Sequence, residues 1–135
     1  MPAPGQLHHI ELYVSSLEQS LRFWQPLLSA LGYVEYQRWP AGVSFNAHGT
    51  YIVFVQAEPR YVEQGYHRKA IGLNHLAFHA QSRAQVNELT SWVKSEGHVV
   101  LYEDRHPYAG GPGHYALYCE DPNRIKVEVV APPET

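Results

Sequence analysis

Two stretches of the chain decide its fold: HIELYVSS at residues 9–16 and HLAFHAQS at residues 75–82. In each, apolar side chains alternate with other side chains, as they do on a half-buried strand. An offset of 66 residues superimposes the two stretches and brings His75 onto His9. A repeat of this kind predicts two copies of one structural unit.

A helix is predicted to follow each of these strands. Ser16 with Gln19, and Ser82 with Gln85, form Ser-x-x-Gln capping boxes, in which the serine oxygen accepts a hydrogen bond from an early helical N–H. The apolar pattern then runs at helical spacing until a glycine ends it in both copies. Pro26 is expected to kink the first helix, because it removes a backbone donor.

Three further strands are expected after each helix. The predicted strands are residues 7–14, 33–39, 42–46 and 50–56 in the first copy, and 73–80, 99–103, 114–119 and 124–130 in the second. The chain is therefore predicted to be one α+β domain, with module one at about 5–57, a linker at about 58–71 and module two at about 72–131. Two tandem βαβββ modules would form a concave mixed sheet around a central cavity, with the helices outside.

The composition limits the classes of function. The chain has 135 residues and a formal net charge of -3 at pH 7, so it lacks the basic field that a nucleic-acid backbone requires. One cysteine cannot form an intrachain disulfide, no signal-peptide pattern is present, and no apolar run approaches the roughly 18 residues of a membrane span. We expect a cytoplasmic protein that binds neither nucleic acid nor membranes. Nine histidines and ten tyrosines suggest a lined cavity for a small-molecule substrate.

Two histidines and a glutamate are the candidate metal ligands. His9 and His75 hold the same place in the two copies, on the strand face turned away from the helix, and Glu128 falls on the corresponding face of the last strand. Two imidazoles and one carboxylate suit a divalent ion with open coordination positions. Glu11 and His79 share this predicted face, where either one acts as a general base or orients a ligand.

The remaining polar side chains are interpreted more simply. His8 is expected at the helix side or the strand edge. Surface positions in or next to turns are expected for five histidines: His48, His67, His98, His106 and His114. A cluster precedes the second module, where it either caps the cavity and neutralises an anionic substrate or forms a solvated linker: Tyr61, Tyr66, Arg68 and Lys69.

These residues resemble the vicinal oxygen chelate superfamily, which includes glyoxalase I, bleomycin-resistance proteins, fosfomycin-resistance enzymes and extradiol dioxygenases. The resemblance rests on residues 9–17, on residues 73–78 and on the closing DPNRIKVE at residues 121–128. It implies the paired βαβββ fold and one divalent metal ion, which would be zinc, nickel, manganese or iron. The metal ligands that it implies are His9, His75 and Glu128.

The fourth ligand of glyoxalase I is where the chain departs from that enzyme. Aligning residues 51–57 on residues 125–131 puts Phe54 opposite Glu128. Phenylalanine cannot bind a metal, which argues against glyoxalase I activity. Gln56, two residues further on, is the candidate substitute, as a weak ligand or a substrate contact.

A tyrosine is the implied catalytic donor. Tyr118 matches a tyrosine that fosfomycin-modifying enzymes and extradiol dioxygenases place beside the metal, where its hydroxyl would hydrogen-bond an oxyanion or donate a proton. The stretch through Glu128 also resembles the extradiol signature, with Arg124 at a position where that signature has Gly or Pro.

The expected function is Lewis-acid catalysis on a small substrate that offers two oxygens, by lyase, isomerase or ring-opening transfer chemistry. Tyr118 is the expected donor, Glu11 or His79 the proton shuttle, and Gln56, Phe54 and Arg68 the substrate-binding residues. One alternative is an Fe(II) extradiol-type dioxygenase, and another is a protein that sequesters a small molecule or antibiotic without catalysis. A homodimer is a further expectation.

Overall fold

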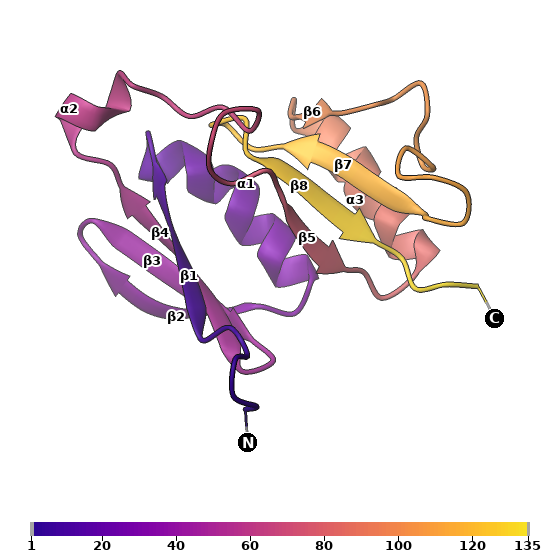
Figure 1. Cartoon of the computed structure of the whole chain (residues 1–135), viewed down its shortest axis with the longest axis horizontal. Coiled ribbons are helices and arrows are strands. Elements are labelled where there is room, and N and C mark those ends of the chain that lie inside the picture. Colours follow the sequence, from indigo (N-terminus) through magenta and orange to yellow (C-terminus); the bar gives the residue numbers. More distant parts are fainter. Residues whose placement is uncertain (1, 135) are drawn as a thin grey trace. The chain divides into compact units, whose positions relative to one another are not determined.

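The computed structural model describes residues 2–134 and divides them into two units, one ending at Gly65 and the other beginning at Tyr66 (Figure 1). The first unit contains β1 (His9–Val14), α1 (Leu17–Ala30), β2 (Val34–Trp39), β3 (Gly42–Ala47), β4 (Thr50–Gln56) and the short α2 (Pro59–Val62). The second contains β5 (Leu76–His79), α3 (Arg83–Ser95), β6 (Val99–Val100), β7 (Ala116–Glu120) and β8 (Lys126–Val130). The boundary falls within the segment predicted to be a linker, which also holds α2.

The two units repeat one topology. Their strand orders are β1-β4-β3-β2 and β5-β8-β7-β6. In each, the first strand pairs in parallel with the last, and the remaining pairs are antiparallel. The predicted α+β class and the paired βαβββ modules are confirmed.

Both predicted capping boxes begin their helices. The Ser16 hydroxyl accepts a hydrogen bond from the Gln19 N–H at 3.2 Å, and the Ser82 hydroxyl accepts one from the Gln85 N–H at 3.1 Å. Each cap satisfies a backbone donor that the first turn of a helix leaves free. Helix α1 continues through Pro26, which is exposed, so the carbonyl that loses its partner lies on the solvent side.

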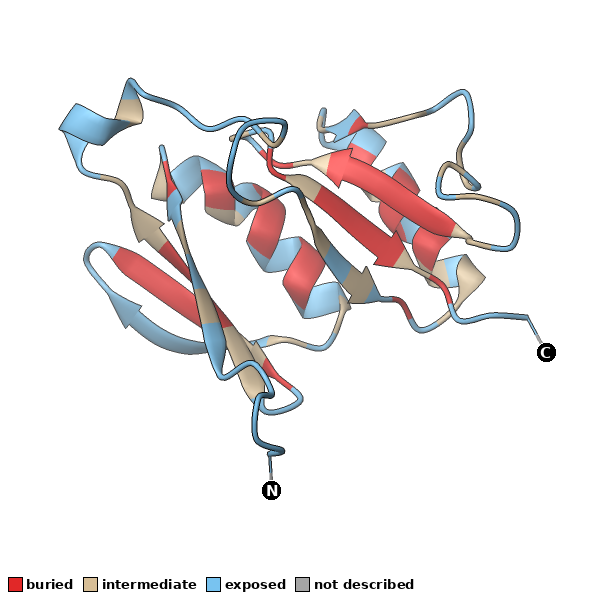
Figure 2. Cartoon of the chain, in the orientation of Figure 1, coloured by how far each residue is buried: buried red, intermediate tan, exposed pale blue. Residues whose placement is uncertain are grey.

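One face of each helix is buried against its own sheet (Figure 2). In the first unit Trp24 is fully buried and its ring lies 5.0 Å from that of Phe54 on β4. In the second unit Val86 and Val93 of α3 are fully buried. The apolar spacing of the two helices predicts both Trp24 and Trp92 in the core; Trp24 is a core residue, whereas Trp92 is only half-buried.

Cys119 is also a core residue, on β7 of the second unit. Its side chain is fully buried. Burial raises the pKa of the Cys119 thiol to about 12, with further contributions from Asp121 and Glu120. The thiol therefore stays protonated and unreactive at neutral pH.

Strand β6 is shorter than the sequence predicts. Strand was expected through residue 103, but β6 ends at Val100. Tyr102 has a φ of 57°, in the left-handed region, which a strand cannot include. Among residues 2–134, no helix combines the length and the apolar character needed to cross a membrane.

Candidate functional site

One face of the second sheet carries four of the nine predicted site residues: His75, His79, Tyr118 and Glu128. Glu128 on β8 lies opposite Ala77 of β5 on one side and opposite Tyr118 of β7 on the other. Residues opposite one another in a sheet point to the same face. The neighbouring Val127 and Val129 are fully buried on the other face, toward α3. Glu128 and Tyr118 are therefore brought together, as predicted.

His75 faces the Glu128 carboxylate directly. Its Nε2 lies 3.1 Å from Oε1 of Glu128, and its Nδ1 lies 2.6 Å from Oδ1 of Asn74. The Asn74 oxygen can only accept, so Nδ1 carries a proton and donates it. The lone pair of Nε2 in a neutral imidazole then points at a carboxylate oxygen, which is unfavourable unless a proton or a metal ion lies there.

The donor set of this pair fits a divalent metal ion. Glu128 is buried, with its side chain 7% exposed, whereas the His75 side chain is 32% exposed and open to a ligand. An imidazole oriented by a hydrogen bond at its other nitrogen, beside a carboxylate, is a common metal-binding arrangement. Among residues 2–134, no group of three or more histidine, cysteine, aspartate or glutamate side chains is gathered closely enough to hold an ion by itself.

His114 is a site residue that the sequence interpretation missed. Its Nε2 lies 2.5 Å from Oε2 of Glu128, so the carboxylate is engaged through both oxygens. His114 was expected to be a surface residue because it lies next to a glycine-rich turn. The available signal was its spacing: it lies four residues before Tyr118, and the period of two along a strand puts the two on one face.

Tyr118 is held as a protonated phenol. Burial, together with the nearby Glu128 carboxylate, raises the pKa of Tyr118 to about 12. A Cβ added at Gly110 would lie 2.6 Å from the Tyr118 hydroxyl oxygen and 2.5 Å from a ring carbon of His114. The loop backbone therefore packs directly against both side chains, which only glycine allows at this position.

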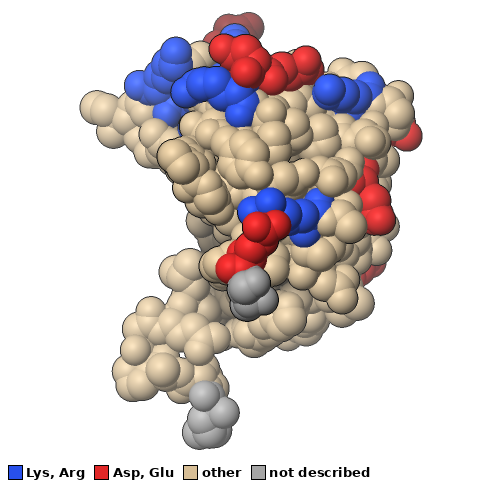
Figure 3. All heavy atoms as spheres, turned by 90° about the vertical axis from the view of Figure 1, so that its right-hand side faces the viewer, with Lys and Arg blue, Asp and Glu red and all other residues tan. Residues whose placement is uncertain are grey.

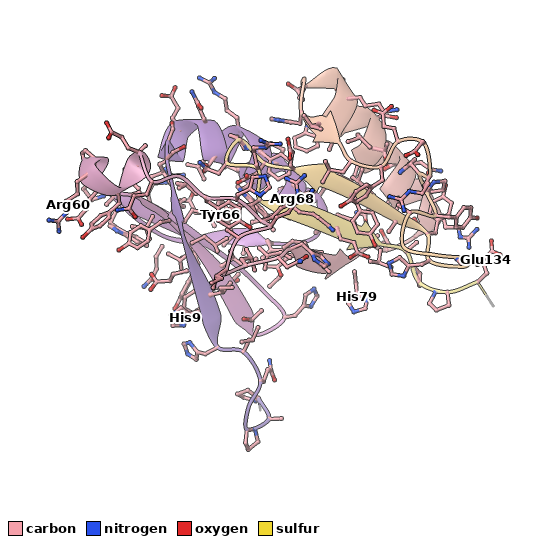
Figure 4. All side chains as sticks on the ribbon, turned by 45° about the horizontal axis from the view of Figure 1, so that its top comes forward. His9, Arg60, Tyr66, Arg68, His79 and Glu134 are labelled. Carbon is pink, nitrogen blue, oxygen red and sulfur yellow. The ribbon has the colours of Figure 1, made fainter. Side chains whose placement is uncertain are left out.

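The other predicted proton shuttles lie on the first strands of the two units. His79 projects from β5, on the face that carries Glu128 (Figure 4). In the first unit, the His9 ring stacks on that of Tyr51 at 4.7 Å, and its Nδ1 lies 2.9 Å from Nδ1 of His8. Glu11 is exposed on the same face of β1 as His9. His9 and Glu11 therefore belong to a different unit from His75 and Glu128.

The prediction that Phe54 corresponds to Glu128 is wrong. Phe54 is fully buried in the first unit, where it packs against Trp24 of α1. The register pairs Glu11 with Val53 in the first unit and Ala77 with Glu128 in the second. Glu11 and Ala77 are equivalent in the repeat, so Val53 holds the place of Glu128. Phe54 is a core residue and not a substrate-binding residue.

Gln56 also has a structural role instead of the predicted substrate contact. Its Oε1 accepts a hydrogen bond from the Leu17 N–H at 2.9 Å, and its Nε2 donates to the Ser15 carbonyl at 2.9 Å. The side-chain amide thus caps the first turn of α1. Both of its polar atoms are engaged within the first unit, so it is not a free ligand for metal or substrate.

Arg68 is held by an ion pair within the second unit. Its Nη1 lies 2.7 Å from a carboxylate oxygen of Glu120, and both side chains are only 12% exposed. The same nitrogen donates to the Arg124 carbonyl at 3.1 Å. The positive charge that was predicted to neutralise a substrate is therefore already paired. Tyr66, labelled with Arg68 in Figure 4, donates to the Leu73 carbonyl at 2.6 Å.

On the face that Figure 3 shows, basic and acidic side chains are interspersed. Arg83 pairs with Glu134 at 2.9 Å, and basic and acidic groups lie next to one another in Figure 3. The face in Figure 3 shows no continuous basic stripe of the kind typical of nucleic-acid binding among its described residues.

Fold and site together define a paired βαβββ protein with a histidine–carboxylate pair on its second sheet. Residues 6–129 match the Glyoxalase/Bleomycin resistance protein/Dioxygenase superfamily, and the chain belongs to it.

Similar proteins are found in several bacteria. The chain is 58% identical over 126 residues to the uncharacterized protein YqjT of Bacillus subtilis (strain 168). The aligned region covers 93% of this chain and 98% of YqjT. A solved structure from Bacillus halodurans, whose name places it with the glyoxalases, is 59% identical with a TM-score of 0.94, covering 96% of this chain and 97% of the other. The fosfomycin resistance protein FosX of Listeria monocytogenes is 23% identical with a TM-score of 0.69, covering 98% and 95%, and it shares the fold.

Proposed function

We propose that this protein is a metal-dependent enzyme that acts on a small substrate through two of its oxygen atoms. One observation carries the proposal: Nε2 of His75 faces Oε1 of Glu128 at 3.1 Å while Nδ1 of the same ring is committed to Asn74. A divalent ion resolves this contact between two lone pairs. His75 and Glu128 are the proposed ligands, and His9 stays the third ligand predicted from the sequence.

A metal ion bound by these residues would act as a Lewis acid and stabilise negative charge on a substrate oxygen. A structure of a glutamate-to-glutamine mutant of FosX from Listeria monocytogenes holds Mn(II) and 1S,2S-dihydroxypropylphosphonic acid, a ligand with two neighbouring hydroxyl oxygens. That pairing supports metal-assisted chemistry on oxygen-rich small molecules as the starting hypothesis for this chain.

Tyr118 is the proposed hydrogen-bond donor to the developing charge. A pKa of about 12 keeps its hydroxyl protonated at neutral pH, and its register position opposite Glu128 places it next to the proposed ligand pair. A protonated phenol aimed at an oxyanion lowers the energy of the transition state without a change in its own charge. His79, on the same sheet face, and Glu11 stay the predicted proton shuttles.

Titration of the dialysed protein with Mn(II) in a calorimeter tests the proposal. We expect about one ion per chain for the wild type and a loss of affinity greater than 100-fold for His75→Ala and for Glu128→Gln, because outer partners of a metal site alone are worth roughly 10- to 100-fold. His98→Ala is the matched control, since His98 lies in the loop between α3 and β6. Equal binding by all four proteins would contradict the assignment.

The identity of the bound metal separates the alternatives. Iron retained by the purified protein, with oxygen uptake on catechols, would favour the extradiol-type dioxygenase. A protein that binds no metal but binds aromatic ligands equally with and without a chelator would favour sequestration. The homodimer stays a prediction that light scattering checks.

A further inference from the structure

Lys126 lies two residues before Glu128 on β8 and shares its sheet face. Leu76 pairs with Val127; His75 directly precedes β5, and Lys126 is the first residue of β8. A positive charge is therefore placed beside the His75–Glu128 pair.

The cross-strand partner of Lys126 is occupied by other cations. Glu120 lies directly opposite Lys126 in the register and would normally pair with it. Instead, Glu120 binds Nη1 of Arg68 at 2.7 Å and has the guanidinium of Arg124 3.9 Å away. The half-buried Glu120 carboxylate is thus neutralised by the two arginines and not by Lys126.

The Lys126 ammonium group contacts two tyrosines instead of a carboxylate. Its Nζ donates to the Tyr102 hydroxyl at 3.1 Å, and it lies 5.1 Å from the centre of the Tyr102 ring and 5.3 Å from that of Tyr118. Among residues 2–134, no carboxylate lies within ion-pair distance of Lys126. Its ammonium group carries three protons, of which this hydrogen bond uses one.

The Tyr102 hydroxyl can donate a hydrogen bond next to the Lys126 ammonium group. Its hydroxyl oxygen accepts from Lys126, so its own proton is free to donate. Its backbone is held at a φ of 57°, which costs energy for a residue other than glycine and is common at functional sites. A second cation, Arg105, lies with its guanidinium carbon 5.1 Å from the centre of the Tyr102 ring.

We propose that Lys126 and Tyr102 form an oxyanion subsite beside the His75–Glu128 pair, so that the substrate carries a carboxylate, phosphate or phosphonate in addition to the two oxygens that face the metal. This inference rests on the proposed function. It makes Lys126 the specificity-determining residue, because the charge of Arg68 is already neutralised by Glu120 and that of Lys126 is not.

Matched hydroxamates test the subsite. Acetohydroxamate chelates a divalent ion through two oxygens, and phosphonoacetohydroxamate and malonohydroxamate add a phosphonate or a carboxylate to the same chelating group. We expect the Mn(II)-loaded wild type to bind one of the two anionic compounds at least about tenfold more tightly than acetohydroxamate, as charge-assisted hydrogen bonds allow. The compound with the larger preference identifies the type of anion.

Four variants locate the preference. Lys126→Met should lose the preference for the anionic hydroxamate and keep the wild-type affinities for Mn(II) and for acetohydroxamate. Lys126→Arg should retain most of this preference. Tyr102→Phe should lose part of it. Lys94→Met removes the same charge from α3, on the other side of the sheet, and should behave as the wild type.

The outcomes separate the two claims. An anion preference that is absent from the wild type, or unchanged in Lys126→Met, overturns the subsite while Mn(II) binding still supports the proposed function. A wild-type protein that binds no Mn(II) overturns the proposed function and the subsite with it.

Discussion

The two units have the same topology but different chemistry on the sheet face away from the helix. In the second unit this face carries Glu128 with Tyr118 opposite, and in the first unit the equivalent pair is Val53 with Ser44 opposite. The Ser44 hydroxyl accepts a hydrogen bond from the Gln37 N–H at 3.1 Å. The helix-facing partners of both units are alike in being apolar, with Phe54 in the first unit and Val129 in the second both fully buried. Packing therefore constrains one face of the repeated sheet, while the other face is free to carry different functions.

The largest expected effect follows from placing Phe54 in the core of the first unit. Phe54→Ala should lower the free energy of unfolding by about 3–5 kcal/mol, because it leaves a cavity beneath Trp24. The equivalent change in the second unit, Val129→Ala, removes fewer atoms and should cost less. Urea denaturation monitored by tryptophan fluorescence measures the loss of stability in both variants. An unchanged midpoint for Phe54→Ala would contradict the placement of Phe54 in the core.

The next effect concerns His114, which distinguishes the second sheet from the first. His114→Gln should weaken Mn(II) binding roughly 10- to 100-fold, because His114 orients the carboxylate of a proposed ligand without binding the ion. Calorimetric titration measures the change. His106→Gln, in the same loop, is the control, and equal affinities for the two variants would show that His114 does not position Glu128.

The smallest effect concerns Gln56 in the first unit. Gln56→Ala should cost about 1 kcal/mol of stability, since it removes a helix cap, and should leave Mn(II) affinity unchanged. Denaturation and metal titration of the same sample provide both values. Reduced metal affinity with full stability would instead support the ligand role that the sequence suggested.

Much of this fold follows from local patterns that the sequence displays. The capping boxes at Ser16 and Ser82 and the alternation along the strands predict helices and strands within a few residues of their observed bounds. The same alternation places Glu128 and Tyr118 on one face. These features depend on near neighbours in the chain, so they can be read without the tertiary structure.

The failures arise where a shift of one residue or a distant contact decides the outcome. Aligning the last strands of the two modules with a slip of one residue moved Phe54 from the core to the polar face, because neighbouring strand residues point to opposite faces. The pairing of Arg68 with Glu120 joins residues far apart in the sequence. The position of Gln56 on a strand suggests a substrate contact, but the first turn of α1 needs an acceptor for its free N–H, and this contact forms between residues 39 positions apart.

Crystals grown with Mn(II), measured at a wavelength where manganese scatters anomalously, test the central claim most directly. The account predicts one strong anomalous peak within coordination distance of Nε2 of His75 and Oε1 of Glu128. Its absence at full Mn(II) concentration, or a peak at other residues only, would contradict the assignment of this pair as the metal site.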